Sequence, residues 1–200
     1  NLEQFRVEDN HLSGLIPPEL GNLTKLQYLW LNDNGFEGEI PPSLASLSNL
    51  VPYTPQNYSG LYLEYNMLTV SDFATKLWAD AYNPGWDATQ TVAPGSFTAQ
   101  QLTPNSMKVF ITPIAYSGYG YYEIEARPAV GDVITTRTNS RADTEWVVGG
   151  LQPNVDYLFR VRSVSPVNPN GGLPHRVTLQ SPFADSFIQL PTLTETGLCA

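Results

Sequence analysis

The chain has 200 residues, of which 42% are hydrophobic, 12% are aromatic and only 14% are charged, and its 17 prolines and 15 glycines predict short strands and many turns rather than long helices. The formal net charge is −9, and it is concentrated in residues 1–94, where three basic side chains face eleven acidic ones (3 − 11 = −8). An acidic surface repels phosphate backbones, so we exclude nucleic-acid binding, and the absence of any run of about 18 apolar residues predicts no membrane span.

A 24-residue repeat runs through the first part of the chain. Ten positions between residues 2 and 23 recur between residues 26 and 47, in the pattern L-x-x-L-x-L-x-x-N-x-L-x-G-x-I-P-x-x-L. Repeats of this length stack as similar units around one continuous core. The pattern resembles the leucine-rich-repeat family, in the G-x-I-P subtype that is common in plant receptor ectodomains and also occurs in bacterial surface proteins. The resemblance implies a solenoid of short parallel strands with an irregular or 3-10 convex side.

Each repeat should contain a short strand whose side chains alternate between the core and the outside. Leu29 and Leu31 are expected to point inward, so their neighbours point outward. The outward positions should form the inner, concave face of the solenoid: Gln4, Arg6, Glu8, Tyr28, Trp30, Asn32, Tyr62 and Glu64. Exposed Tyr and Trp beside polar groups indicate a surface that binds a protein or glycan partner. The alternative is that these rings only cover neighbouring repeats.

An asparagine recurs at positions 10, 34 and 66, and the resemblance implies that its amide bonds neighbouring backbone groups as the family's asparagine ladder. The third repeat is longer than the others, since Leu61 follows Leu29 by 32 residues rather than 24. The eight extra residues lie within 51–60, and an insertion in a repeat stack is expected in a surface loop. This loop is either a contact loop or a tolerated irregularity.

Residues 71–82 carry apolar side chains at helical spacing, with Ser71 as the expected N-cap. We interpret this segment as a capping helix that, with Trp86, covers the last hydrophobic face of the solenoid. No such cap precedes the first repeat. The sequence therefore predicts either further repeats before residue 1 or self-association through the uncapped N-terminal repeat.

From residue 95 the repeat gives way to short β-rich runs separated by turn residues, in which apolar and polar side chains alternate. Residues 150–164, GLQPNVDYLFRVRSV, resemble the fibronectin type III family around its strands E and F. The resemblance covers about residues 95–192 and implies an all-β, immunoglobulin-like sandwich. It also implies that Leu151 is buried and that the hydroxyl of Tyr157 ties a turn between two strands.

We therefore predict a multidomain chain. Residues 1–94 form C-terminal leucine-rich repeats with a capping helix at about 71–82, residues 95–192 form the sandwich, and residues 193–200 form a tail. Residues 113–121 and the long connection from 165 to 180 have the composition of binding loops. Their candidate binding side chains are Tyr116, Tyr119, Asn168, Asn170, His175 and Arg176.

The sequence offers little for catalysis. Only His11 and His175 occur, without zinc-ligand spacing, and there is neither a G-x-S-x-G nor a glycine-rich phosphate-binding motif. We expect no enzymatic activity, no metal and no cofactor. The single cysteine, Cys199, cannot form a disulfide within the chain. Asn22 and Asn57 fit the N-glycosylation pattern, which applies if the source is eukaryotic.

These features favour a non-catalytic recognition or adhesion protein that is extracellular, either secreted or at the cell surface. Two alternatives stay open. The chain could be an accessory spacer of a larger secreted enzyme, whose catalytic domain would lie outside these residues. It could also be a structural subunit of an extracellular filament or surface layer, built by open head-to-tail stacking.

Overall fold

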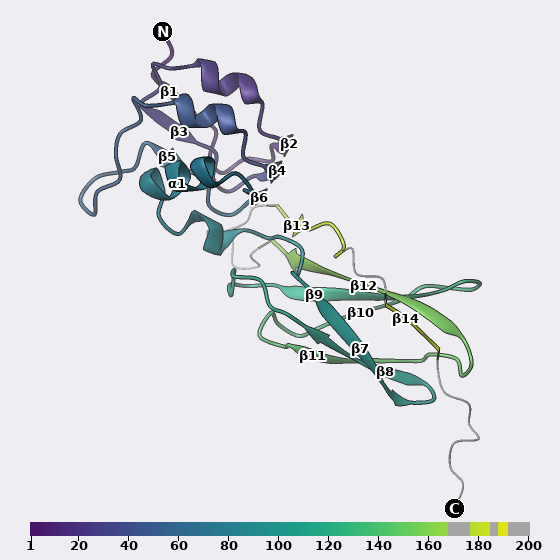
Figure 1. The fold of residues 1–200 in the computed structure, drawn as a ribbon. Coiled ribbons are helices and arrows are strands. Elements are labelled where there is room, and N and C mark those ends of the chain that lie inside the picture. Colours follow the sequence, from purple (N-terminus) through teal and green to yellow (C-terminus); the bar gives the residue numbers. More distant parts are fainter. Residues whose placement is uncertain (168–176, 185–187, 192–200) are drawn as a thin grey trace, which may run out of the picture. The chain divides into compact units, whose positions relative to one another are not determined.

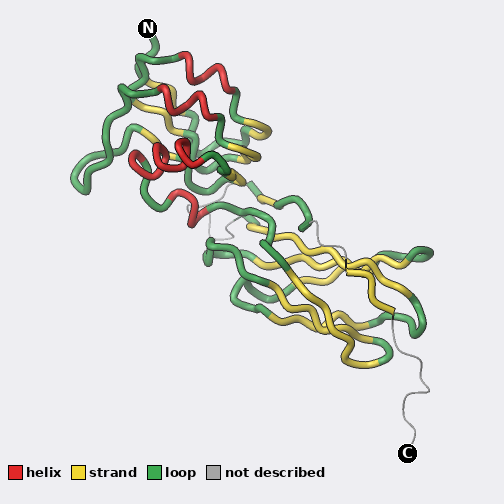
Figure 2. Tube along the Cα trace, in the orientation of Figure 1, coloured by secondary structure: helices red, strands yellow, loops and turns green. Residues whose placement is uncertain are grey.

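A computed structural model describes residues 1–167 and 177–184, together with the backbone of 188–191. The chain divides into two compact units (Figure 1). One contains Asn1–Thr91 and is called the repeat unit below; the other contains Val92–Ile114 and Gly118–Val164 and is called the sandwich unit. Among the described residues, every helical segment lies in the repeat unit, and none is long and apolar enough to cross a membrane (Figure 2).

Two parallel sheets of three strands each build the repeat unit, and every repeat contributes one strand to each sheet. The first sheet consists of β1 (Gln4–Arg6), β3 (Tyr28–Trp30) and β5 (Leu61–Tyr62). The second consists of β2 (Ser13–Leu15), β4 (Gly35–Glu39) and β6 (Met67–Thr69). The register pairs Phe5 with Leu29 and Leu29 with Leu61, so equivalent positions of successive repeats lie side by side.

Short 3-10 helices return the chain from the second sheet to the first. They are η1 (Pro18–Asn22) and η2 (Pro42–Ser46), each preceded by a proline in extended conformation. Proline fixes φ and lacks an N–H group, so it suits the entry to a helical turn. Gly38, at φ +78°, adopts a left-handed conformation that other residues rarely accept.

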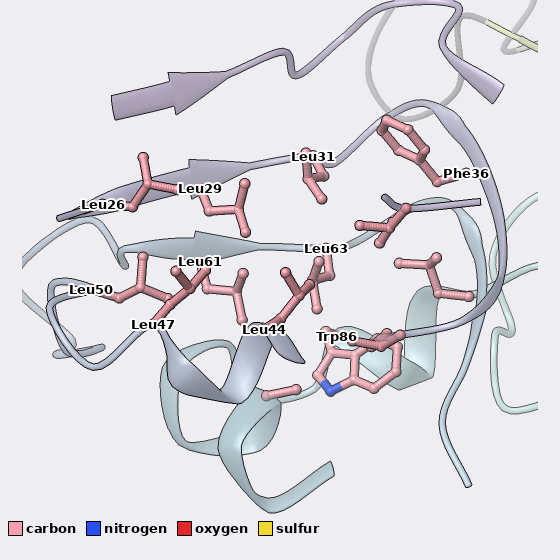
Figure 3. Packing of buried hydrophobic residues seen from close by; sticks show 14 residues of the cluster. Leu26, Leu29, Leu31, Phe36, Leu44, Leu47, Leu50, Leu61, Leu63 and Trp86 are labelled. Carbon is pink, nitrogen blue, oxygen red and sulfur yellow. The ribbon is translucent and has the colours of Figure 1, made fainter. Parts of the chain in front are cut away.

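Between the sheets and these turns lies a core of leucines (Figure 3). Leu29, Leu31, Leu61 and Leu63 are almost wholly buried, as are four leucines of the connecting segments, Leu26, Leu44, Leu47 and Leu50. Burying one such side chain stabilises the fold by roughly 1.5–3 kcal/mol. The inward orientation expected for Leu29 and Leu31 is therefore confirmed.

Buried amides tie the repeats together. Nδ2 of Asn66 donates to the carbonyl oxygens of Leu31, Leu63 and Glu64 at 3.0, 3.2 and 3.2 Å, and its Oδ1 accepts from the amide of Phe36 at 3.0 Å. Asn34 makes the same contacts one repeat earlier, and Asn10 donates to two carbonyl oxygens at the exposed end of the row. The asparagine ladder implied by the sequence is present.

The ladder has a fourth rung that the sequence analysis missed. Nε2 of Gln90 donates to the carbonyl oxygen of Leu63 at 3.0 Å, and its Oε1 accepts from the amide of Leu68 at 3.0 Å. Gln90 follows Asn66 by 24 residues, so the repeat period returns after the long third repeat. The longer side chain of glutamine reaches the same backbone groups that asparagine serves elsewhere.

Side chains also close the last strand of the first sheet. In the described part of the chain no further strand pairs with the far side of β5. The amide of Leu63 donates instead to Oδ1 of Asn83 at 2.8 Å, and the amide of Tyr65 donates to Oγ1 of Thr89 at 3.2 Å. An edge whose donors are satisfied in this way no longer templates another strand.

The helix after this edge differs from the expectation. α1 (Phe73–Tyr82) is capped by Asp72 rather than Ser71, and it buries only the small residues Thr75 and Ala79. Phe73 and Leu77 are 80% and 60% exposed, and of its large side chains only Trp78 and Tyr82 pack against the core, both partly buried. Trp86, from η3 (Trp86–Thr89), is the large side chain that enters the core. Over the described residues the structure shows short parallel strands and 3-10 turns, but neither a clear solenoid nor a capping helix.

The insertion forms a loop closed at its base. The amide of Gly60 donates to the carbonyl oxygen of Val51 at 2.7 Å, and the amide of Val51 donates to the carbonyl oxygen of Gln27 at 3.0 Å. Most residues between these two are exposed, including Tyr53 and Tyr58. The extra residues thus leave and rejoin the repeat at almost one point, as a surface loop does.

The sandwich unit contains two antiparallel sheets. One has the order β11 (Glu145–Gly149), β8 (Ser106–Ile111), β7 (Phe97–Thr103). The other contains β10 (Ile134–Arg137), β9 (Tyr121–Pro128), β12 (Asp156–Ser165) and β13 (Leu179–Gln180), with β14 (Ile188–Pro191) also paired to β12.

The core of the sandwich unit follows the alternation seen in the sequence. Tyr122, Ile124 and Phe159 are fully buried between the sheets. Leu151 is buried too, and the hydroxyl of Tyr157 accepts a hydrogen bond from the amide of Gln152 at 3.0 Å. The roles implied for Leu151 and Tyr157 are confirmed.

Candidate binding surface

The outward side chains of the first sheet of the repeat unit form a row across the repeats. The register places Arg6 beside Trp30, and Trp30 beside Tyr62. Because parallel strands in register hold equivalent positions at a fixed spacing, side chains from three repeats meet on one face. We call this surface, formed by Arg6, Tyr28, Trp30, Tyr58 and Tyr62, the aromatic face.

Trp30 lies at the centre of the aromatic face. Its ring centroid is 5.1 Å from that of Tyr62 and 6.1 Å from that of Tyr28, both in edge-to-face geometry. The guanidinium carbon of Arg6 lies 3.9 Å from the Trp30 centroid. The indole Nε1 donates to the carbonyl oxygen of Ser59 at 3.0 Å, so the ring is held in place by the base of the inserted loop.

A hollow of about 350 Å³ adjoins the aromatic face and is called the acidic hollow below. Its lining consists of Glu8, Trp30, Asn32, Asp33, Tyr58, Tyr62, Glu64 and Tyr65. Five of these residues are among the eight predicted for the concave face. The other three predicted residues, Gln4, Arg6 and Tyr28, lie on the same sheet but do not line the hollow.

Sequence reasoning missed Asp33, Tyr58 and Tyr65. Tyr58 comes from the inserted loop, whose course depends on how the chain closes at Gly60. Asp33 and Tyr65 occupy equivalent positions, each directly before a ladder asparagine, and both adopt positive φ, at 54° and 57°. Asp9 shares this position and conformation, with φ 58°. The position directly before each ladder asparagine therefore recurs in the repeat pattern and could have been noticed in the sequence.

Two acceptor atoms at the acidic hollow lack donors. Oε1 of Glu64 accepts from Nδ2 of Asn83 at 2.7 Å, but the buried Oε2 has no hydrogen-bond partner within the described residues. Asn32 donates through Nδ2 to Asp33 at 3.1 Å, while its buried Oδ1 likewise receives no hydrogen bond from the described chain. Burial without partners is costly for polar atoms, and most for a charged group.

The electrostatic setting of Glu64 reflects this cost. Burial raises the pKa of the Glu64 carboxyl. The hydrogen bond from Asn83 and the nearby backbone N–H groups of Glu64 and Leu63 oppose the rise, and the charge of Asp33 adds to it. A raised pKa in the folded state means that the folded protein binds this proton more tightly than the unfolded chain. The stability that Glu64 contributes is therefore fully present below the unfolded pKa and is lost as pH rises through the folded pKa.

Replacing the carboxylate with its neutral isostere should therefore stabilise the protein. Glu64→Gln keeps an oxygen that can accept from Asn83 but removes the uncompensated charge. We expect the free energy of unfolding at pH 7 to rise by about 1 kcal/mol, and the melting temperature by roughly 4 °C. The gain should disappear below about pH 4, where Glu64 itself is neutral.

Urea unfolding at pH 7 and pH 4 measures this difference. Glu37→Gln provides the control, because Glu37 is exposed on β4 and the substitution removes the same charge. A Glu64→Gln protein less stable than the parent at pH 7 would contradict the assignment of Glu64 as an uncompensated buried charge.

The two predicted binding loops of the sandwich are only partly described. Tyr116 is 7% exposed, which leaves little of it for a partner, whereas Tyr119 is 61% exposed. Asn168, Asn170, His175 and Arg176 lie outside the described residues, as does Cys199. Asn22 and Asn57 are both exposed. Within the described residues, no group of three or more His, Cys, Asp or Glu side chains is arranged to hold a metal ion.

A repeat unit and a sandwich unit in one chain define a modular, two-domain class of protein. Family comparison identifies both modules: residues 1–23 and 25–47 match the Leucine Rich Repeat family, and residues 92–172 match the Fibronectin type III domain family. The chain therefore contains leucine-rich repeats followed by a fibronectin type III domain. The match does not distinguish the G-x-I-P subtype, which stays a prediction.

Several solved structures resemble about half of the chain. The FN5 domain of Drosophila Lar is 18% identical, with 52% of this chain and 98% of that chain covered and a TM-score of 0.39. The chicken CNTN1 FN1-FN3 domains are 16% identical, with coverages of 52% and 33% and a TM-score of 0.41. A two-domain fibronectin type III segment of chicken tenascin is 22% identical, with coverages of 51% and 53% and a TM-score of 0.38. No curated protein matches the chain.

Proposed function

We propose that this chain is a non-catalytic extracellular recognition protein that binds a partner through the aromatic face. Leucine-rich repeats and fibronectin type III domains are typical of extracellular adhesion and recognition proteins, commonly bind proteins and are typically non-catalytic. The proposal treats residues 1–94 and 95–192 as its two modules, with a tail at 193–200. It places the chain outside the cell, secreted or at the cell surface.

One observation carries the proposal. Arg6, Trp30 and Tyr62 stand in register on three neighbouring strands, with Tyr58 and Tyr28 beside them. Tyr, Trp and Arg are the residues most enriched at binding hot spots. Tyr and Trp bury much area with few rotatable bonds. Tyr58 is 73% exposed beside an open hollow, which supports a binding role over one of only covering neighbouring repeats.

Truncating the centre of the face should abolish binding. The test screens the intact chain against a panel of extracellular proteins and glycans, and then measures the affinity of the partner found. Trp30→Ala combined with Tyr62→Ala removes two hot-spot side chains, worth about 2 kcal/mol each. We expect the dissociation constant to rise about 1,000-fold, with little change in melting temperature.

A second variant separates binding from folding. Tyr58→Ala removes an exposed ring at the rim of the hollow, and we expect at least about a tenfold loss of affinity. Tyr53→Ala, in the same loop but outside the hollow, is the matched control, at 46% exposure. Unchanged affinity in both the double variant and Tyr58→Ala would exclude the aromatic face as the binding site.

Self-association is the second candidate, on a different observation. β1 ends the order of the first sheet, and an apolar hollow of about 250 Å³ lies at the same end, beside the exposed Leu12 and Leu15. Such an end suits stacking in a filament or surface layer. A monomer that persists at high concentration in sedimentation experiments would exclude it. The accessory-spacer alternative would require a catalytic domain elsewhere in the protein.

A further inference from the structure

The polar groups of the acidic hollow indicate which chemical group a partner would have to place there. Its two orphaned atoms, Oε2 of Glu64 and Oδ1 of Asn32, are both hydrogen-bond acceptors. A ligand that relieves them must bring N–H or O–H donors. A donor that reaches Oε2 displaces no existing hydrogen bond, because that oxygen makes none with the described residues.

The charge around the hollow is one-sided. Glu8, Asp33 and Glu64 contribute carboxylates to its lining, whereas no basic side chain of the described residues does so. Carboxylates held together in a partly enclosed site attract a positive charge more strongly than they would in open water. A cationic donor therefore fits the hollow better than a neutral one.

The aromatic face already holds one such cation. Arg6 places its guanidinium 3.9 Å from the centroid of Trp30 and 4.8 Å from that of Tyr28. Beyond Trp30, the rings of Tyr62 and Tyr58 lie 5.1 and 6.0 Å from it and form the aromatic wall of the hollow. Guanidinium groups stack on such rings while donating hydrogen bonds in their own plane.

We propose that the acidic hollow binds an arginine side chain presented by an exposed segment of a protein partner, stacked against Trp30 and Tyr62 and donating to Glu64 and Asn32. This inference rests on the proposed function, since it assigns the ligand chemistry of the same face. The planar guanidinium, with five N–H donors, can serve two separated acceptors at once, which the compact ammonium of lysine does less well.

The experiment uses the full chain and two short peptides, acetyl-Gly-Ser-Arg-Ser-Gly-amide and the same peptide with citrulline in place of arginine. Citrulline has nearly the same shape but carries no charge. The readout is the NMR shift of the Trp30 indole N–H during titration. We expect the arginine peptide to bind at least tenfold more tightly than the citrulline peptide, and Glu64→Gln to remove most of this difference. Glu37→Gln, the charge-matched control on β4, should leave it unchanged.

The possible results distinguish failure of the arginine site from failure of binding by the aromatic face. Equal shifts with both peptides, no shift with either, or an arginine preference that survives Glu64→Gln would each overturn the arginine site. A neutral oligosaccharide, cellohexaose, that shifts the Trp30 signal more strongly than the arginine peptide would also overturn it, while supporting recognition by the aromatic face. The proposed function itself fails only if the Trp30, Tyr62 and Tyr58 variants leave partner affinity unchanged.

Discussion

A protein carrying Asn66→Ala is expected to lose about 4 kcal/mol of stability in the repeat unit, the largest effect on stability that we predict. The buried side chain of Asn66 serves four backbone groups, from Leu31, Phe36, Leu63 and Glu64. Alanine would leave these buried backbone groups without hydrogen-bond partners. Each such group costs roughly 1–3 kcal/mol, and relaxation of the chain or entry of water reduces the total. Domains of this size have only about 5–15 kcal/mol to lose.

Hydrogen exchange of the amides of Leu31 and Leu63 measures the loss directly. Asn10→Ala is the matched control, since Asn10 is the same residue at the same repeat position but is exposed. Its loss should cost no more than about 1 kcal/mol, because water can replace the two hydrogen bonds. Equal effects of the two substitutions would show that the ladder contributes no more in the core than at the surface.

Gly60→Ala should destabilise the repeat unit almost as much, by about 3 kcal/mol, at the upper end of what overpacking costs. A Cβ atom at Gly60 would lie 2.6 Å from the carbonyl oxygen of Gln27 and 2.7 Å from that of Val51, and would also meet the amide nitrogen of Val51. All three are backbone atoms, so no side-chain rotation relieves the contact. The substitution has to part the base of the inserted loop from β3.

Gly95→Ala is the control for this prediction. Nothing lies within 4 Å of a Cβ atom at Gly95, and its φ is not in the left-handed region. At this position the substitution should be neutral or raise stability by about 0.5 kcal/mol, because alanine lowers the conformational entropy of the unfolded chain. Thermal unfolding of both variants tests the pair, and a Gly60→Ala protein as stable as the parent would contradict the close approach at the loop base.

The repeat part of the fold follows closely from the sequence because its signal is redundant. Leu29, Leu31 and the asparagines recur at fixed spacing, and each recurrence predicts the same contact again. The sequence analysis did not assign Gln90 to the ladder because it is a glutamine rather than an asparagine, although its spacing from Asn66 is regular. α1 was misjudged for another reason: helical periodicity shows that a helix forms, but not which side faces the core. Here Thr75 and Ala79 face inward, while Phe73 and Leu77 do not.

The candidate site likewise contains residues that the sequence predicts and others that it does not. Trp30, Tyr62 and Glu64 sit on strands, where period-two alternation fixes the direction of each side chain. Tyr58 belongs to a loop, and its place beside Trp30 depends on backbone contacts between residues distant in sequence. The orphaned oxygens of Glu64 and Asn32 are beyond any sequence pattern, since whether a buried atom finds a donor is settled only by three-dimensional packing.

The closed base of the inserted loop allows the loop sequence to change in evolution independently of the repeats. The chain leaves the stack at Val51 and re-enters it at Gly60, where the two residues are hydrogen-bonded to each other. The length and composition of the segment between them can therefore drift without shifting the phase of the leucines or the ladder. Because this segment delivers Tyr58 to the rim of the acidic hollow, the proposed binding surface can change by exchange of a few loop residues while the scaffold stays the same.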